Sequence, residues 1–109
     1  MFGIAKWTFA GASGAGYTMR VKGMRNALPP VPAVYVCAYL HPKGHLAGHV
    51  AEPVFIGATD DLAATMQDHP AVECLRYECA NCVCWLECDA SDERQRIVDD
   101  LEKVHPAKC

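Results

Sequence analysis

Val34-Tyr-Val-Cys-Ala-Tyr-Leu40 is the segment from which the architecture can be worked out, because β-branched and aromatic side chains occupy most of its positions. Apolar residues fall on both alternating sets of positions, so both faces of this strand are expected to be buried. We therefore predict a central strand over 34–40. Pro53-Val-Phe-Ile-Gly-Ala58 has the same character and predicts a second strand, with residues 41–52 as the loop between the two.

Before this central strand, the sequence predicts an N-terminal β-hairpin. Lys6–Ala10 and Tyr17–Val21 are its two strands, and the glycine-rich segment 11–16 is its turn. No Lys-Ser or Lys-Thr pair follows these glycines, so a hairpin turn is favoured over a phosphate-binding loop. A short turn of helix is expected over Met24–Leu28, since the two prolines that follow cannot continue a helix.

After the second strand, the pattern predicts a helix over 60–69, and then two more strands over Ala71–Cys79 and Cys82–Cys88 that are joined by a tight turn. A last amphipathic helix is expected to begin at Ser91 and to end before Pro106. Together these elements predict an α+β fold, in which a small mixed β-sheet is flanked by helices and preceded by an N-terminal β-hairpin.

Length and composition indicate one domain over residues 1–109, with 1–28 as a hairpin extension and 29–109 as the core. A content of 51% hydrophobic and 21% charged residues excludes a disordered chain. No run of about 18 apolar residues is present, so no membrane partner is expected. The N-terminal residues do not form a secretory signal pattern, and a cytoplasmic location with reduced thiols is therefore expected.

Charge is unevenly distributed along the chain. Residues 1–51 hold five Lys and Arg residues and no Asp or Glu, whereas residues 52–109 hold all 13 acidic residues. One interpretation is a basic layer beside an acidic layer within a single fold. The other is a basic face that binds an anionic partner, with Arg20, Lys22 and Arg25 as the candidate contacts to nucleic-acid phosphates.

Five of the seven cysteines lie within residues 74–88. The spacing of Cys79 and Cys82 suits one tetrahedral metal ion, and Cys84 and Cys88 could complete four thiolate ligands for zinc. Cys74, His105 and Cys109 are the alternative ligands. If residues 82–88 are extended, however, Cys82 and Cys88 lie about 20 Å apart, which is too far for a single ion. Buried core thiols, zinc ligands, and a redox or disulfide pair are therefore three open interpretations of this cluster.

Two short motifs, Ala33-Val34-Tyr35 and Phe55-Ile56-Gly57, are followed by Asp61-Leu62 and by His69, and this series resembles the GIY-YIG endonuclease domain. The resemblance covers about residues 29–109. It implies that the two motifs lie on adjacent strands of a small sheet. It also implies a helix directly after them and a later helix that carries a metal-binding glutamate.

The resemblance assigns roles position by position. Tyr35 stands where the family's tyrosine helps to activate the attacking water, and His69 matches a histidine near the end of the helix. Gly57 keeps the glycine of the second motif, which permits the close approach of a neighbour or a ligand. Phe55 replaces the second tyrosine, and Thr65 replaces the arginine that stabilises the scissile phosphate.

The metal-binding glutamate is also replaced, because Ile97 or Val98 stands at its position. Losing one charged group of this kind typically costs about 3–4 kcal/mol of transition-state stabilisation, and here two such groups are replaced. We therefore predict a non-catalytic binding or assembly module whose partner is nucleic acid or a protein.

Two alternatives remain beside this prediction. The first is a magnesium-dependent endonuclease in which Tyr35, His69 and a displaced carboxylate, Asp99 or Asp100, carry out the chemistry. The second is a module with a structural zinc ion bound by cysteines.

Overall fold

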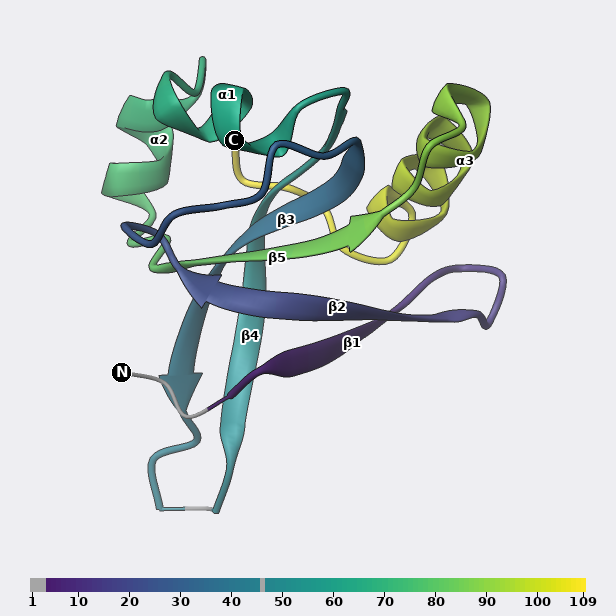
Figure 1. Cartoon of the computed structure of the whole chain (residues 1–109). Helices are drawn as coiled ribbons and strands as arrows, with labels where there is room; N and C mark the ends of the chain where they lie inside the picture. Colours follow the sequence, from purple (N-terminus) through teal and green to yellow (C-terminus); the bar gives the residue numbers. More distant parts are fainter. Residues whose placement is uncertain (1–3, 46) are drawn as a thin grey trace.

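The structure is a computed structural model that describes residues 4–45 and 47–109, and Figure 1 shows its arrangement. The chain has an α+β fold, as the sequence predicts. Its described elements are β1 (Lys6–Ala10), β2 (Gly16–Gly23), β3 (Ala33–Pro42), β4 (His49–Thr59), α1 (Leu62–Gln67), α2 (Val72–Tyr77), β5 (Cys82–Glu87) and α3 (Ser91–Glu102).

All five strands form one sheet in the order β1-β2-β5-β3-β4, and every neighbouring pair is antiparallel. The prediction of a mixed sheet is therefore wrong. β2 and β3 run in the same direction, but β5 lies between them and pairs antiparallel with both. Because β2 pairs with β5, the N-terminal hairpin is continuous with the rest of the sheet.

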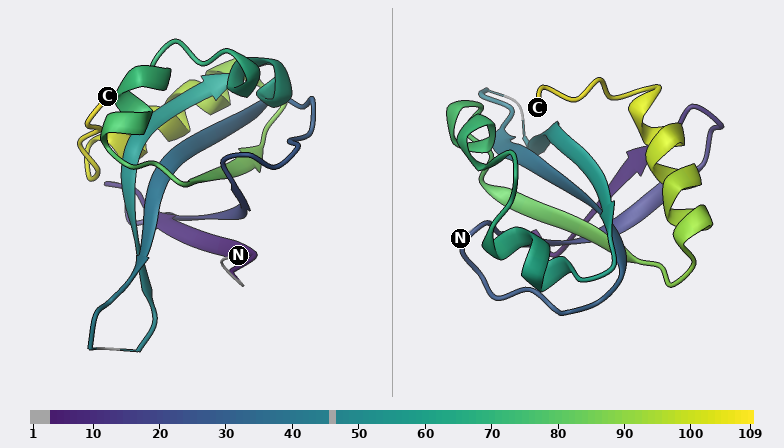
Figure 2. Two further views of the ribbon diagram at one scale, coloured as in Figure 1. Left: turned by 90° about the vertical axis from the view of Figure 1, so that its left-hand side faces the viewer. Right: turned by 90° about the horizontal axis from the view of Figure 1, so that it is seen from above.

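Helices cover both faces of the sheet, as the two views in Figure 2 show. On one face α3 packs over a cluster named here the α3 core: Phe9, Tyr17, Met19, Val21, Val34, Val36, Ala38, Leu40, Ile56, Cys82, Cys84, Ile97, Val98 and Leu101. On the other face α1 and α2 pack over the α1–α2 core: Ala33, Tyr35, Cys37, Val54, Leu62, Leu75, Val83 and Trp85. The first residues of β3 alternate between the two cores, which explains why both faces of this strand are apolar.

The prediction of a strand over Ala71–Cys79 is wrong, because residues 72–77 form the helix α2. Both sides of the central strand β3 are already paired, one with β4 and the other with β5. A further strand in the middle of the sheet would find no partner, whereas a helix satisfies its own backbone hydrogen bonds. Within α2 only Leu75 is buried, and it packs into the α1–α2 core.

Two connections also differ from the sequence prediction. The predicted loop over 41–52 is too long, because β3 and β4 stay paired as far as Pro42 and His49. These strand ends form an arm that extends beyond the rest of the sheet in Figure 1. Residues 24–28 form a turn and an extended connection instead of the expected helical turn, since Met24 and Leu28 pack against the α1–α2 core.

The helices of the described residues are short. None of them combines the length and the apolar character that are needed to cross a membrane.

Candidate functional site

Tyr35 and Gly57 lie directly opposite each other on the adjacent strands β3 and β4. The Tyr35 side chain packs in the α1–α2 core and is only 3% exposed. A Cβ atom added at Gly57 would lie 3.1 Å from the Tyr35 hydroxyl and 2.7 Å from the Phe55 ring. The close approach that the sequence predicts at Gly57 is therefore made by the protein's own aromatic rings.

His69 follows α1 and completes this group, which we name the Tyr35 cluster (Tyr35, Phe55, Gly57 and His69). The Nε2 atom of His69 lies 2.8 Å from the Tyr35 hydroxyl oxygen, and its Nδ1 accepts the backbone N–H of Ala71 at 3.0 Å. Because Nδ1 is an acceptor, the neutral ring carries its proton on Nε2 and donates it to Tyr35. The Phe55 ring stacks on Tyr35 at 5.7 Å and meets His69 edge-on at 4.6 Å.

Burial controls the protonation of the Tyr35 cluster. It raises the pKa of Tyr35 above its ordinary value, and it lowers the pKa of His69. Both groups are therefore neutral over the physiological range. His69 donates a hydrogen bond to the phenol oxygen and does not accept one from the phenol O–H, so this arrangement does not prepare a phenolate to activate water.

Uncharged side chains occupy the positions where the GIY-YIG resemblance implies an arginine and a glutamate. The Thr65 hydroxyl is hydrogen-bonded to the Thr59 hydroxyl at 2.6 Å. Ile97 and Val98 are buried in the α3 core, which lies on the opposite face of the sheet from Tyr35. Among the described residues, no charged side chain forms an ion pair or a hydrogen bond with the Tyr35 cluster.

The two carboxylates proposed as displaced catalytic groups lie on α3. Asp99 is exposed, whereas Asp100 is buried and accepts three hydrogen bonds. The donors are the Tyr17 hydroxyl at 2.7 Å, the Ser13 hydroxyl at 2.7 Å and the Ser13 backbone N–H at 2.8 Å. The hydrogen bond from Tyr17, followed by those from Ser13, holds the pKa of Asp100 below its usual value.

The glycine-rich segment 11–16 is thus the place where α3 docks onto the β1–β2 hairpin. A Cβ atom at Gly11 would lie only 2.1 Å from an Asp100 carboxylate oxygen, so the absence of a side chain there admits Asp100. The sequence analysis missed this role for Asp100. Its partners lie 83 and 87 residues away, and no local pattern signals a contact at that separation.

The structure does not bring the four predicted zinc ligands together. Cys82 and Cys84 are buried on one face of β5, Cys79 is exposed in a left-handed backbone conformation with φ of +63°, and Cys88 follows the end of β5. Within residues 4–45 and 47–109, no group of three or more His, Cys, Asp or Glu side chains is placed to hold a metal ion. A zinc ion bound by cysteines stays an untested prediction.

Cys74 and Cys109 form a disulfide, so the expectation of reduced thiols is wrong for this pair. The segment after α3 runs along the edge of β4, where the backbone N–H groups of Lys108 and Cys109 both donate to the Val54 carbonyl at 3.0 Å. This edge contact brings Cys109 beside α2. Because residues 72–77 were expected to form a strand, the sequence pattern did not indicate that the two sulfur atoms meet.

A row of basic side chains lies on the exposed side of the β1–β2 hairpin. Residues alternate strictly along β2, with Tyr17, Met19 and Val21 buried and Thr18, Arg20 and Lys22 exposed. Lys6 of β1 lies directly opposite Arg20, and Arg25 follows in the turn after β2. We name these four residues the basic strip: Lys6, Arg20, Lys22 and Arg25. None of them forms an ion pair with a described acidic residue.

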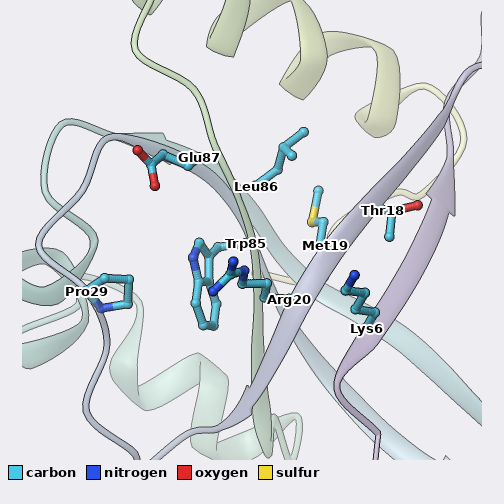
Figure 3. Close-up of a pocket in the computed structure, with 8 residues that line it drawn as sticks. All are labelled: Lys6, Thr18, Met19, Arg20, Pro29, Trp85, Leu86 and Glu87. Carbon is cyan, nitrogen blue, oxygen red and sulfur yellow. The ribbon is translucent and has the colours of Figure 1, made fainter.

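A surface hollow of about 370 Å³ opens beside the basic strip and is shown in Figure 3. Lys6 and Arg20 reach toward it from the hairpin, and Trp85 and Glu87 come from β5. Pro29 closes it from the connection that leads to β3. The hollow therefore carries two cations and one carboxylate, and this positive balance suits a phosphate-bearing partner, while Trp85 is only 5% exposed and belongs to the α1–α2 core.

Comparisons with known proteins add no relative to this geometry. The chain matches no protein-family model, no curated protein and no solved structure.

Sequence reasoning identified Arg20, Lys22 and Arg25 as basic candidates, and the structure places all three at one end of the hairpin face or in the turn after it. It did not include Lys6 or Trp85. The alternation along Lys6–Ala10 was the available signal for Lys6, since it puts that residue on the polar face of its strand. Trp85 needed the strand order, because only the pairing of β5 with β2 places it opposite Arg20.

Proposed function

We propose that this chain is a non-catalytic nucleic-acid-binding module with a GIY-YIG-like core, and that its basic strip contacts the phosphates. The observation that carries the proposal is a contrast between two places in the molecule. The Tyr35 phenol and the His69 ring are uncharged and buried, whereas the basic strip is charged and exposed.

The arrangement of the two motifs supports a GIY-YIG-like core. Tyr35 and Gly57 are direct partners on adjacent antiparallel strands, and α1 follows the second of these strands after a short connection. His69, just beyond α1, reaches back to the Tyr35 hydroxyl. The resemblance implies these same relations for Tyr35, Gly57 and His69.

The energetics of phosphodiester cleavage favour a non-catalytic role. Cleavage needs positive charge beside the developing phosphorane, and removing one such group commonly lowers the rate by a hundredfold or more. Thr65 supplies no cation at the expected position, and the buried Ile97 and Val98 supply no carboxylate to hold a metal ion. The phenol of Tyr35 is also too buried to reach a phosphate in solvent.

The electrostatics of the hairpin favour nucleic acid as the partner. Four cations without described acidic partners lie on one side of a two-stranded ribbon and the turn that follows it. Each phosphate that such a cation neutralises releases a condensed counterion, and this release drives binding even though the whole chain carries a net charge of −3. The acidic residues all come from the second half of the sequence, so none of them lies within the hairpin that carries the basic strip.

The test is a fluorescence-anisotropy titration with labelled single-stranded and duplex DNA between about 50 and 200 mM salt. We expect affinity to fall steeply with salt. The triple variant Arg20→Gln, Lys22→Gln, Arg25→Gln is expected to reduce the slope of log Kd against log salt by about 2 to 3. The double variant Lys43→Gln, Lys103→Gln is the matched control, since both lysines are exposed and lie outside the strip; it should keep nearly all of the affinity.

Three results would contradict the proposal. If neither probe binds at the lowest salt, or if the control weakens binding as much as the triple variant, the strip is not a nucleic-acid site and a protein partner becomes the favoured reading. The same preparation, incubated with magnesium and supercoiled plasmid, should produce no nicked DNA. Nicking that is lost in Tyr35→Phe would show that the chain is an endonuclease.

A further inference from the structure

A second, larger groove lies between the end of β2 and the two short helices. Its volume is about 770 Å³. One wall is the turn Gly23–Asn26, and the other is formed by α1, α2 and the turn that precedes β5. The groove is separate from the hollow in Figure 3, with which it shares no lining residue.

The interior of this groove is apolar. Met24 comes from the turn, Met66 from α1, and Val72 and Leu75 from α2. Val72 is 38% exposed, one of the few large apolar residues of the described chain that is open to solvent. Methionine side chains are flexible and polarizable, so two of them allow the groove to adapt to apolar ligands of different shapes.

Its charged groups are of one sign. Arg25 enters from the turn and Arg76 from α2. No Asp or Glu lines the groove, although α2 belongs to the half of the sequence that holds all 13 acidic residues. Arg76 has only a loose, exposed contact of 3.5 Å with Glu73, and Arg25 has no described acidic partner. Both guanidinium groups are therefore available to an anion.

The other polar side chains at the inner end are already satisfied. His69 is bonded to Tyr35 and to the backbone of Ala71. The amide of Asn81 both donates to the Leu40 carbonyl and accepts from the Leu40 N–H. A ligand in the groove thus meets an apolar interior and finds its free polar partners at the two arginines and at the exposed Asn26 of the turn.

From this combination we infer that the groove binds a small amphipathic anion, in which a carboxylate or phosphate head lies between Arg25 and Arg76 and an aliphatic body covers Met24, Met66 and Val72. A volume of about 770 Å³ lies within the usual range of small-molecule sites. Guanidinium groups match carboxylate and phosphate oxygens in geometry as well as in charge. Arg25 belongs to both the groove and the basic strip, whereas Arg76 lies outside the strip, so variants of Arg76 test the groove separately from the nucleic-acid proposal.

The test is a titration with decanoate and with decyl phosphate, followed by NMR of protein that carries ¹³C-labelled methionine methyl groups. The Met24 and Met66 signals are expected to shift saturably, with a Kd that is millimolar or tighter for a ligand of this size. The Met19 methyl provides an internal control, since that side chain is 1% exposed in the α3 core and should not shift. The tighter of the two ligands identifies the preferred head group.

Variants and ligand analogues separate the two parts of the site. Arg76→Gln should weaken decanoate binding by about tenfold, whereas Arg96→Gln, an exposed arginine on α3, should leave it unchanged. Val72→Asp should abolish binding. Val104→Asp, at a valine that is 43% exposed outside the groove, is the matched control. Acetate lacks the aliphatic body and decylammonium lacks the negative charge, so neither should shift Met24 or Met66.

Three results would overturn the inference. They are the absence of any saturable shift with both ligands, equal binding of decylammonium, and unchanged affinity in Arg76→Gln. A measurement of DNA binding by Arg76→Gln distinguishes the two proposals. This variant is expected to bind the amphipathic anion more weakly while keeping its affinity for DNA.

Discussion

His69 couples the buried Tyr35 cluster to pH. Burial lowers the pKa of His69 in the folded chain, whereas an unfolded histidine takes up its proton near pH 6.5. Below about pH 6.5 the unfolded chain therefore binds more protons than the folded one, and the free energy of unfolding should fall as pH decreases. We expect urea unfolding between about pH 5 and 8 to show this loss of stability on the acidic side.

The variant His69→Gln provides the comparison for this pH effect. Glutamine does not titrate, so the loss of stability below about pH 6.5 should become shallower, while His45→Gln, at an exposed loop position, should keep the parent profile. A profile in His69→Gln as steep as that of the parent chain would place the titrating group elsewhere.

The disulfide joins two elements that the chain connects only over a long distance. Cys74 on α2 and Cys109 are 35 residues apart, and closing a loop of this length contributes about 2–4 kcal/mol to folding stability. We expect a reducing agent to lower the melting temperature of the parent chain and to leave the double variant Cys74→Ala, Cys109→Ala unaffected. The variant itself should melt near the reduced parent. An identical melting temperature with and without reductant would contradict the disulfide.

Native thiol labelling supplies the companion measurement. Cys37, Cys82 and Cys84 are buried, and burial raises the pKa of Cys37 to about 12, so a thiol reagent should not react with them in the folded protein. Cys79 is exposed and Cys88 partly exposed, and these two should react first. Mass spectrometry of the labelled protein distinguishes the two groups.

The N-terminal hairpin is an integral part of the molecule. β2 pairs with β5, and Phe9, Tyr17, Met19 and Val21 form part of the α3 core. Removing each such side chain costs about 2–5 kcal/mol, and the total stability of a small domain is only about 5–15 kcal/mol. We therefore expect a fragment of residues 29–109 to remain unfolded, as measured by circular dichroism and thermal melting. Cooperative melting of that fragment would show that the hairpin is a separate extension.

Both strands of the N-terminal hairpin, the strands β3, β4 and β5, and the helices α1 and α3 could be predicted from the sequence because each has a local signature. Alternation along Tyr17–Val21, the β-branched run over 34–40, and the apolar stripe of Ile97, Val98 and Leu101 all lie within a single element. The helix α2 could not be predicted in this way, since Ala71–Cys79 alternates like a strand. What excludes a strand there is that both edges of β3 are already paired, one with β4 and the other with β5. The candidate site shows the same limit of local patterns. Tyr35 and His69 could be identified by motif, but their uncharged state follows from burial, which depends on tertiary packing.

Local order of residue types was thus sufficient for the class of fold, for most of its elements and for the uneven distribution of charge. Contacts between residues far apart were required for the rest. They place β5 between β2 and β3, bring Asp100 to the glycine-rich turn, join Cys74 to Cys109, and open a groove between Arg25 and Arg76. Side-chain pattern repeats over a few residues and can be read along the chain, whereas these contacts depend on which surfaces remain free to pack once the sheet has formed.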